Sequence, residues 1–266
     1  MKLDEMRGAW ALVTGASSGI GKEFCTQLAG KGLNLVLVAR REDRLLTLAA
    51  KLEQDFEVRT LVIVQDLSAA DGASCVVGRV ASAGIHIRLL VNNAAFGRWG
   101  RFEDTPSAAY RDMLTTNTTA LVELTHALLP DLAAGAPSAI INVASAAAYQ
   151  PVPYMAVYAA TKAFVLSFSQ ALHGEWCDRG VLVQTLIPGA TDTEFDEVAK
   201  AYASAITARG SAVDVVRDSI RGLELGSAVA VNAPGTFKQR MFAGLFPPKF
   251  VISQVAKMFG PPNDRA

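Results

Sequence analysis

The chain has little of several features on which specialised protein classes depend. Its three cysteines, Cys25, Cys75 and Cys177, include no C-x-x-C pair, and its three histidines share no ligand spacing. This pattern predicts neither a disulfide framework nor a metal site. The 25 Lys and Arg residues balance 25 Asp and Glu residues, so the basic excess that binds nucleic-acid phosphates is absent. We therefore expect no metal and no nucleic-acid partner.

Long apolar runs are also missing. No uninterrupted run approaches the roughly 18 residues of a membrane-spanning helix, and the first five residues, MKLDE, contain two acids and predict no signal peptide. Hydrophobic residues nevertheless make up 51% of the chain and charged residues 19%, which excludes a disordered protein. We expect a cytoplasmic protein in which residues 1–266 form a single domain, because no linker, repeat or change of composition divides them.

Apolar runs of five to seven residues alternate with helix-like segments along the chain. Because these runs are continuous, they predict strands that are covered on both faces. We expect strands at 9–13, 33–39, 59–64, 87–92, 139–145, 181–187 and 228–231, and helices at 20–29, 42–53, 69–83 and 157–177, with one long or broken helix at 105–129. The alternation predicts an α/β fold, a doubly wound parallel sheet of seven strands with helices on both faces.

A glycine-rich turn lies between the first predicted strand and the first predicted helix. It reads TGASSGIG from Thr14 to Gly21, and the start of a helix offers N–H groups and a positive dipole end to an anion. Glycine lets the backbone approach a pyrophosphate closely. The spacing is G-x-x-x-G-x-G, not G-x-G-x-x-G, so a tight connection without a ligand remains the alternative.

The end of the second predicted strand indicates which dinucleotide is bound. An NAD site places a carboxylate there for the ribose hydroxyls, whereas this chain has Ala39 followed by Arg40 and Arg41. A guanidinium pairs with a 2′-phosphate, so we expect NADP(H). Arg40, which directly follows the strand, is predicted as the main phosphate partner, and a solvated arginine pair is the alternative.

A third cluster indicates proton transfer. Tyr158 and Lys162 lie four residues apart and so share one face of a helix, and Ser145 precedes the tyrosine by thirteen residues. An ammonium group near a phenol lowers its pKa, which predicts that Tyr158 donates a proton to a carbonyl oxygen and accepts it in the reverse direction. A Y-x-x-x-K pair alone occurs by chance in many helices.

Together these motifs resemble the short-chain dehydrogenase/reductase family of about 250 residues, over about residues 7–230. The family's glycine pattern stands at 14–21, and its N-N-A-G is similar to Asn92-Asn93-Ala94-Ala95, with alanine in place of glycine. The resemblance implies a Rossmann fold and an active site of Asn117, Ser145, Tyr158 and Lys162. It implies cofactor contacts from Gly15, Ser17, Ser18, Gly19, Ile20, Gly21, Arg40, Arg41, Asp66, Leu67, Asn93, Ala94, Tyr158, Lys162, Pro188, Gly189, Thr191 and Thr193.

The resemblance also implies a role for each catalytic group. Ser145 would stabilise the substrate oxygen, Tyr158 would transfer the proton, and Lys162 would bind the nicotinamide ribose and lower the pKa of Tyr158. Asn117 would hold a water that connects Lys162 to solvent. The expected activity is hydride transfer between NADPH and a small-molecule carbonyl or alcohol, and the expected assembly is a homodimer or homotetramer formed through the helices at 105–129 and 157–177.

Two further functions remain possible. Relatives of the family reduce 3-oxoacyl thioesters, and a silent NADP-sensing binding protein could keep the fold without the reaction. Retention of both Tyr158 and Lys162 argues against the silent protein.

Two segments fall outside the alternation of strands and helices. Residues 190–221 are helical in pattern and predict a wall over the substrate, with the acids Asp192, Glu194, Asp196 and Glu197 as a solvated helix start. An apolar and basic tail at 236–260 is divided by Pro247-Pro248 into two helical pieces. Three interpretations of the tail stay open, namely core or subunit packing, a wall over an apolar substrate, and contact with a membrane surface.

Overall fold

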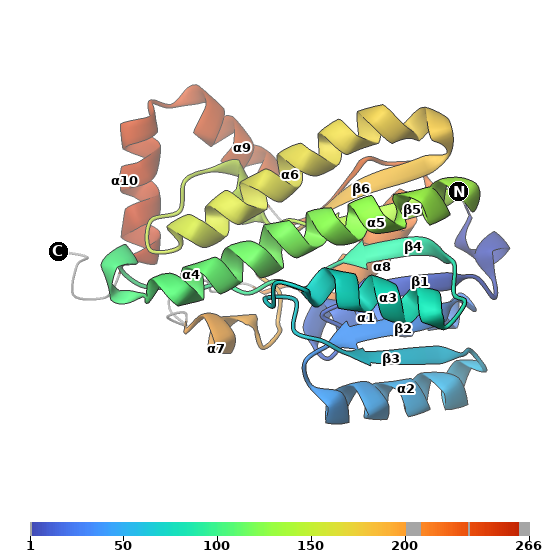
Figure 1. Cartoon of the computed structure of the whole chain (residues 1–266). Coiled ribbons are helices and arrows are strands. Elements are labelled where there is room, and N and C mark those ends of the chain that lie inside the picture. Colours follow the sequence, from blue (N-terminus) through green and yellow to red (C-terminus); the bar gives the residue numbers. More distant parts are fainter. Residues whose placement is uncertain (1, 201–208, 234, 261–266) are drawn as a thin grey trace.

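The chain folds around one parallel sheet of seven strands. The computed structural model describes residues 2–200, 209–233 and 235–260, with the backbone alone at 236–240. The strands lie in the order β3-β2-β1-β4-β5-β6-β7, which confirms the predicted doubly wound sheet (Figure 1). They are β1 (Trp10–Thr14), β2 (Asn34–Ala39), β3 (Thr60–Val64), β4 (Ile87–Asn92), β5 (Ser138–Val143), β6 (Val181–Pro188) and β7 (Val229–Asn232).

Helices cover both faces of the sheet because alternate strand residues point to opposite sides. Side chains such as Val13 and Leu37 pack against α1 (Gly19–Gly30), α2 (Glu42–Phe56) and α8 (Ala212–Glu224). Their neighbours, such as Leu12 and Val38, pack against α3 (Gly72–Ser82), α5 (Ala120–Ala134) and α6 (Ala156–Trp176). Continuous apolar strands therefore supply two separate cores, one on each face.

The structure corrects the end of one predicted strand and decides the form of one predicted helix. The strand expected at 139–145 ends at Val143, because Ser145, although extended, caps the 3-10 turn Ala146–Tyr149 by accepting from the Ala147 amide at 3.2 Å. The helix expected at 105–129 is interrupted. It consists of α4 (Ser107–Leu114), a π-helical turn (Thr115–Thr119) and α5, which is the broken form of the two that the sequence left open, and such turns often occur at functional sites.

The wall expected at 190–221 is shorter than predicted. Its first part contains a short helix, α7 (Phe195–Ala199), and residues 201–208 lie outside the described residues. Its last part is α8, whose Val215, Ile220 and Leu223 are buried in the core beneath the sheet. Most residues after about 212 thus belong to the layer of helices that covers one face of the sheet.

The tail forms the two expected helices, α9 (Thr236–Leu245) and α10 (Pro248–Phe259), separated at Phe246-Pro247. In Figure 1 they stand beyond the sheet, beside the N-terminal half of α6. No helix among the described residues is both long and apolar enough to cross a membrane.

A row of buried polar side chains lies near the carboxyl ends of the central strands β4 and β5. Asn92 on β4 and Asn142 on β5 are register partners, and the Asn92 amide donates to Asn142 Oδ1 at 2.9 Å and to Thr125 of α5 at 3.0 Å. The Asn142 amide donates to Ser169 of α6 at 2.9 Å. These bonds tie two helices of one face directly to the sheet.

Candidate active site

A large cavity opens at the carboxyl ends of the central strands, where open α/β sheets bind ligands. Its volume is about 1440 Å³, larger than the roughly 300–1,000 Å³ of a typical small-molecule site. Lining residues follow four strands: Gly15 after β1, Asn93 after β4, Ser145 after β5 and Gly189 after β6. The space is sufficient for a dinucleotide and a second molecule.

The glycine turn forms one wall of this cavity, and its shape requires glycine. Gly15 and Gly19 have positive φ angles of 68° and 53°. A Cβ on Gly21 would lie 2.2 Å from the Gly15 carbonyl oxygen, and one on Gly15 would lie 2.7 Å from Asn93 Nδ2. Ser18, the N-cap of α1, makes no side-chain cap, as at helix starts that bind anions. The residues present therefore fit a dinucleotide pyrophosphate.

Asn93 and Ala94 hold this turn in place. Their backbone amides both donate to Thr14 Oγ1 at 3.0 Å, and Asn93 Nδ2 donates to the Thr14 carbonyl at 2.9 Å. Hydrogen bonds thus connect the predicted cofactor-binding residues that follow β4 to the glycine turn that follows β1. Asn93, Ala94 and Ala95 all line the cavity.

The arginine pair is placed differently from the sequence expectation. The Arg41 guanidinium donates to Ser17 Oγ at 3.0 and 3.1 Å and to Ser18 Oγ at 2.7 Å, beside the glycine turn. Arg40 is 67% exposed and lies 3.6 Å from Asp66. The strand does end at Ala39 as predicted, and Arg41, not Arg40, lies against the serines of the glycine turn.

Asp66 and Leu67, which follow β3, line the same end of the cavity. Partial burial acts to raise the pKa of Asp66, but hydrogen bonds from Ser68 and the Arg40 charge lower it below its ordinary value. Asp66 is therefore an ionised acceptor at neutral pH.

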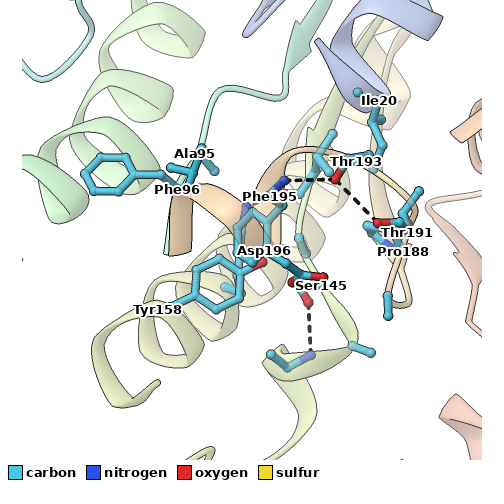
Figure 2. Close-up of a pocket in the computed structure, with 18 of the residues that line it drawn as sticks. Ile20, Ala95, Phe96, Ser145, Tyr158, Pro188, Thr191, Thr193, Phe195 and Asp196 are labelled. Atoms are coloured by element: carbon cyan, nitrogen blue, oxygen red, sulfur yellow. Dashed lines mark hydrogen bonds between the residues drawn. The ribbon is translucent and has the colours of Figure 1, made fainter. Parts of the chain in front are cut away.

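Tyr158, Ser145 and Lys162 meet at the opposite end. Tyr158 is 8% and Lys162 3% exposed, and both lie on the buried side of α6 as their spacing predicts. The Ser145 side chain is near enough to the Tyr158 hydroxyl to act on its pKa, and Lys162 Nζ donates to the Val143 carbonyl at 2.8 Å. Figure 2 shows Tyr158 and Ser145 facing the same space, with Phe195 and Asp196 beside them.

Burial has the largest effect on the pKa values of Tyr158 and Lys162. It raises the pKa of Tyr158 to about 12, with Asp196 acting in the same direction and Ser145 against it. Burial also lowers the pKa of Lys162 to about 7. The predicted lowering of the Tyr158 pKa by Lys162 is therefore wrong for this structure, in which Lys162 Nζ lies 5.8 Å from the Tyr158 ring centroid.

Asn117 has a different place from the other catalytic candidates. It is 2% exposed and does not line the cavity, although its neighbour Thr116 does. Its Nδ2 donates to the Phe96 carbonyl and to Thr161 Oγ1, and its Oδ1 accepts from the Phe96 amide. The side chain thus fixes the loop after β4, and the water relay stays a prediction.

The segment after β6 crosses the cavity, and we call residues 189–200 the strap. Gly189 donates to Asn232 at 2.9 Å, and Thr191 bridges to Gly210. The Thr193 side chain lies 3.0 Å from where a Gly19 Cβ would be, and the two segments approach each other in Figure 2. Pro188, Gly189, Thr191 and Thr193 all line the cavity as predicted.

The sequence interpretation missed three strap residues. The Phe195 ring lies 5.1 Å from that of Tyr158. Glu194 pairs with Arg41 at 2.6 Å and with Arg44, and Asp196 pairs with Arg209 at 2.6 Å. The acidic run is thus not a solvated helix start at these two positions. Among the residues that the structure describes, no group of three His, Cys, Asp or Glu side chains could hold a metal.

The tail helices form an apolar wall of the same cavity. Phe242, Phe250, Val255 and Met258 line it, and α10 packs through Val251 and Val255 onto a cluster that includes Tyr158. The packing and pocket-wall interpretations are therefore both correct for this face. Contact with a membrane stays a prediction.

Comparison with known proteins agrees with this geometry. Residues 9–203 match the family model for short chain dehydrogenases. The chain belongs to the short-chain dehydrogenase/reductase family. The chain is 34% identical over 195 residues to a very-long-chain 3-oxoacyl-CoA reductase of Bos taurus, and the match covers 72% of this chain but only 62% of the relative's length.

Two solved structures also resemble this short-chain dehydrogenase. A short-chain dehydrogenase from Sphingobium yanoikuyae in complex with NADPH is 31% identical, with a TM-score of 0.81 over 89% of this chain and 93% of the other. A 7β-hydroxysteroid dehydrogenase is 26% identical, with a TM-score of 0.84 over 96% of this chain and 100% of the other.

Replacing Lys162 by methionine is expected to stabilise the protein most at low pH. The pKa of this ammonium group falls from an ordinary 10.5 to about 7 on folding, so between these values the unfolded chain binds the extra proton. The buried Lys162 ammonium group therefore lowers the stability of the folded parent protein. This loss of stability is greatest below pH 7 and disappears as the pH rises toward 10.5. Loss of the bond to Val143 offsets part of the gain.

We expect the melting temperature of Lys162→Met to exceed that of the parent by at least about 3 °C at pH 6. This difference should shrink by pH 9–10 in thermal scans without cofactor. Lys51→Met, at an exposed lysine that pairs with Asp55, is the control and should show no such trend. A variant difference that is constant with pH would contradict the burial of a charge at Lys162.

Proposed function

We propose that the protein is an NADPH-dependent oxidoreductase that transfers a hydride between the cofactor and a carbonyl or alcohol carbon of a large apolar substrate. The observation that carries this proposal is the shared cavity. Ser145, Tyr158 and Lys162 border the same cavity as the glycine turn and Arg41.

The chain's own residues supply the proton side of the reaction. Ser145 donates a hydrogen bond to the substrate oxygen, which gains negative charge as the carbonyl double bond breaks. The Tyr158 hydroxyl gives its proton to that oxygen, and in the reverse direction it accepts it. Lys162, with a pKa near 7, can hold or release a proton at neutral pH and so restore the proton of Tyr158. The bound nicotinamide supplies the hydride and, when oxidised, a positive charge.

The choice of NADPH is supported by the arginines. Arg41 lies at the glycine turn, where a guanidinium can form paired hydrogen bonds to a 2′-phosphate. The end of β2 provides Ala39 in place of the carboxylate that favours NAD. The relative from Sphingobium yanoikuyae is in complex with NADPH.

The apolar substrate is supported by the far wall of the cavity. The rings of Phe242, Phe246 and Phe250 lie 4.8–5.8 Å apart, and Phe250 and Met258 are 44% and 56% exposed where they border the cavity. Covering these side chains with an apolar ligand would remove apolar surface from water, at roughly 25 cal/mol per Å².

A 3-oxoacyl thioester is the second candidate substrate. The relative from Bos taurus is named a very-long-chain 3-oxoacyl-CoA reductase, and a fatty acyl chain suits the same apolar wall. A silent NADP-binding protein is disfavoured, because Ser145, Tyr158 and Lys162 are all retained and line the same cavity.

NADPH oxidation measured against matched carbonyl substrates tests this proposal. We expect turnover of bulky ketones, steroid ketones or long-chain 3-oxoacyl thioesters to exceed that of short aldehydes, because only large substrates reach the α9–α10 wall. Turnover confined to small polar carbonyls would contradict the apolar assignment. Binding of NADPH with no turnover of any carbonyl would favour the silent protein.

We further propose a homodimer or homotetramer. The outer faces of the helices predicted to pair carry exposed apolar groups, including Leu114 and Phe164 at 46% and 42%. Light scattering should therefore give a mass of at least twice 28.2 kDa. A stable species of one chain at micromolar concentration would contradict this assembly.

A further inference from the structure

Glu194 joins the two sides of the proposed cofactor groove. Its two carboxylate oxygens bind different guanidinium groups, that of Arg41 at 2.6 Å and that of Arg44. These arginines belong to the start of α2, whereas Glu194 belongs to the strap, about 150 residues later. The two hydrogen bonds and charges lower the pKa of Glu194, so the carboxylate is ionised at neutral pH.

The contact occupies the hydrogen-bonding groups that a 2′-phosphate needs. Arg41 has five N–H donors in a planar fork. In the structure Nε and Nη2 donate to Ser17, Nη2 also donates to Ser18, and Nη1 donates to Glu194. A phosphate that forms paired bonds with this guanidinium must replace one of these partners. Glu194 is the one that carries negative charge, so it is the partner that a second anion repels.

The strap also reaches the catalytic tyrosine. Directly before Glu194, Thr193 lies against Gly19 of the glycine turn. Directly after it, the Phe195 ring lies 5.1 Å from the Tyr158 ring, and the Asp196 charge helps to raise the Tyr158 pKa. Figure 2 shows Thr193 near Ile20 of the glycine turn and Phe195 near Tyr158. A displacement of Glu194, which lies between them in the chain, would therefore shift side chains at both ends of the cavity.

We propose that Glu194 is a cofactor-selectivity residue that competes with the 2′-phosphate of NADP(H) for Arg41. NAD(H) has no 2′-phosphate and leaves the ion pair in place. NADP(H) displaces the carboxylate and so releases the strap from α2. This inference rests on the proposed use of NADP(H) but assigns a role to a residue that the proposed reaction does not use.

Two other roles for the ion pair of Glu194 predict different effects on the affinity for the cofactor. If the ion pair served to close the strap over a bound cofactor, its loss would weaken every dinucleotide. If the pair were a surface contact without function, its loss would change nothing. The sign of the change in affinity distinguishes the three roles.

Binding of adenosine fragments isolates the 2′-phosphate from the nicotinamide and from catalysis. We suggest titrating the full chain by calorimetry with adenosine 2′,5′-bisphosphate and with adenosine 5′-monophosphate. The variant is Glu194→Gln, which keeps the size of the side chain and removes its charge. The control is Glu197→Gln, which makes the same charge change on the same strap, at an exposed residue that does not line the cavity.

We expect Glu194→Gln to bind adenosine 2′,5′-bisphosphate roughly 3- to 10-fold more tightly than the parent, the range for two partly exposed ion pairs. Its affinity for adenosine 5′-monophosphate should change less than twofold, and Glu197→Gln should match the parent with both fragments. Weaker or unchanged binding of the bisphosphate by Glu194→Gln would overturn the inference. A parent that binds both fragments equally would instead refute the proposed choice of NADP(H), which is a separate result.

Discussion

Tyr158→Phe is expected to lower kcat by roughly 10²–10⁴, the usual contribution of a positioned general acid. The variant loses the hydroxyl of a residue that lines the cavity together with Ser145, but it keeps the ring that packs on Phe195. The dissociation constant for NADPH should therefore change little. Both quantities can be measured on one preparation, by single-turnover kinetics and by a binding titration.

A tyrosine outside the cavity provides the matched control. Tyr110 on α4 donates its hydroxyl to the Phe102 carbonyl, and it does not line the cavity. Tyr110→Phe removes the same atom and should retain the kcat of the parent. If Tyr158→Phe kept more than about a tenth of the parental rate, Tyr158 would not be the proton donor.

The parent enzyme is expected to prefer NADPH over NADH by roughly 10- to 100-fold in kcat/KM. Hydrogen bonds to charged groups contribute about 1.5–3 kcal/mol each, and the partial exposure of Arg41, at 38%, places the effect at the lower end. Ala39→Asp combined with Arg41→Leu should move the preference toward NADH. The new carboxylate would accept from the ribose hydroxyls and repel a phosphate.

A second double variant shows which arginine matters. Ala39→Asp with Arg40→Leu follows the sequence prediction, whereas the structure places Arg41 on Ser17 and Ser18 and pairs Arg40 with Asp66. We expect the larger shift in the ratio of kcat/KM values from the Arg41 variant. A parent that prefers NADH, or double variants that leave the ratio unchanged, would refute the assignment.

Local sequence patterns were enough to predict the sheet and most of the cavity. Continuous apolar runs between helical segments indicate buried parallel strands, and the glycine turn and the Tyr158–Lys162 pair each lie within eight residues. The structure brings these two motifs to the same cavity. The end of β5 was misjudged because Ser145, with φ −169° and ψ 159°, has strand-like angles without strand pairing.

The remaining features depend on distant residues. Glu194 meets Arg41 across 153 positions, and no local pattern distinguishes such an acid from one in solvent. The pKa values of Tyr158 and Lys162 depend on burial by the whole fold, so the i, i+4 spacing predicted their shared face but not the direction of the Tyr158 shift. The choice between Arg40 and Arg41 likewise required the position of Ser17.

The polar row in the sheet has a consequence for how α6 is aligned. Apolar contacts have no direction, so a helix held by them alone could slide along the sheet with little loss of buried area. The amide of Asn142 donates to Ser169, seven residues beyond Lys162 on the same helix, and a hydrogen bond is lost within about an ångström of displacement. Asn142, together with Val143, which accepts from Lys162, therefore fixes α6 along its axis, and the axial position of Tyr158 is set from the carboxyl end of β5, next to the cavity that it serves.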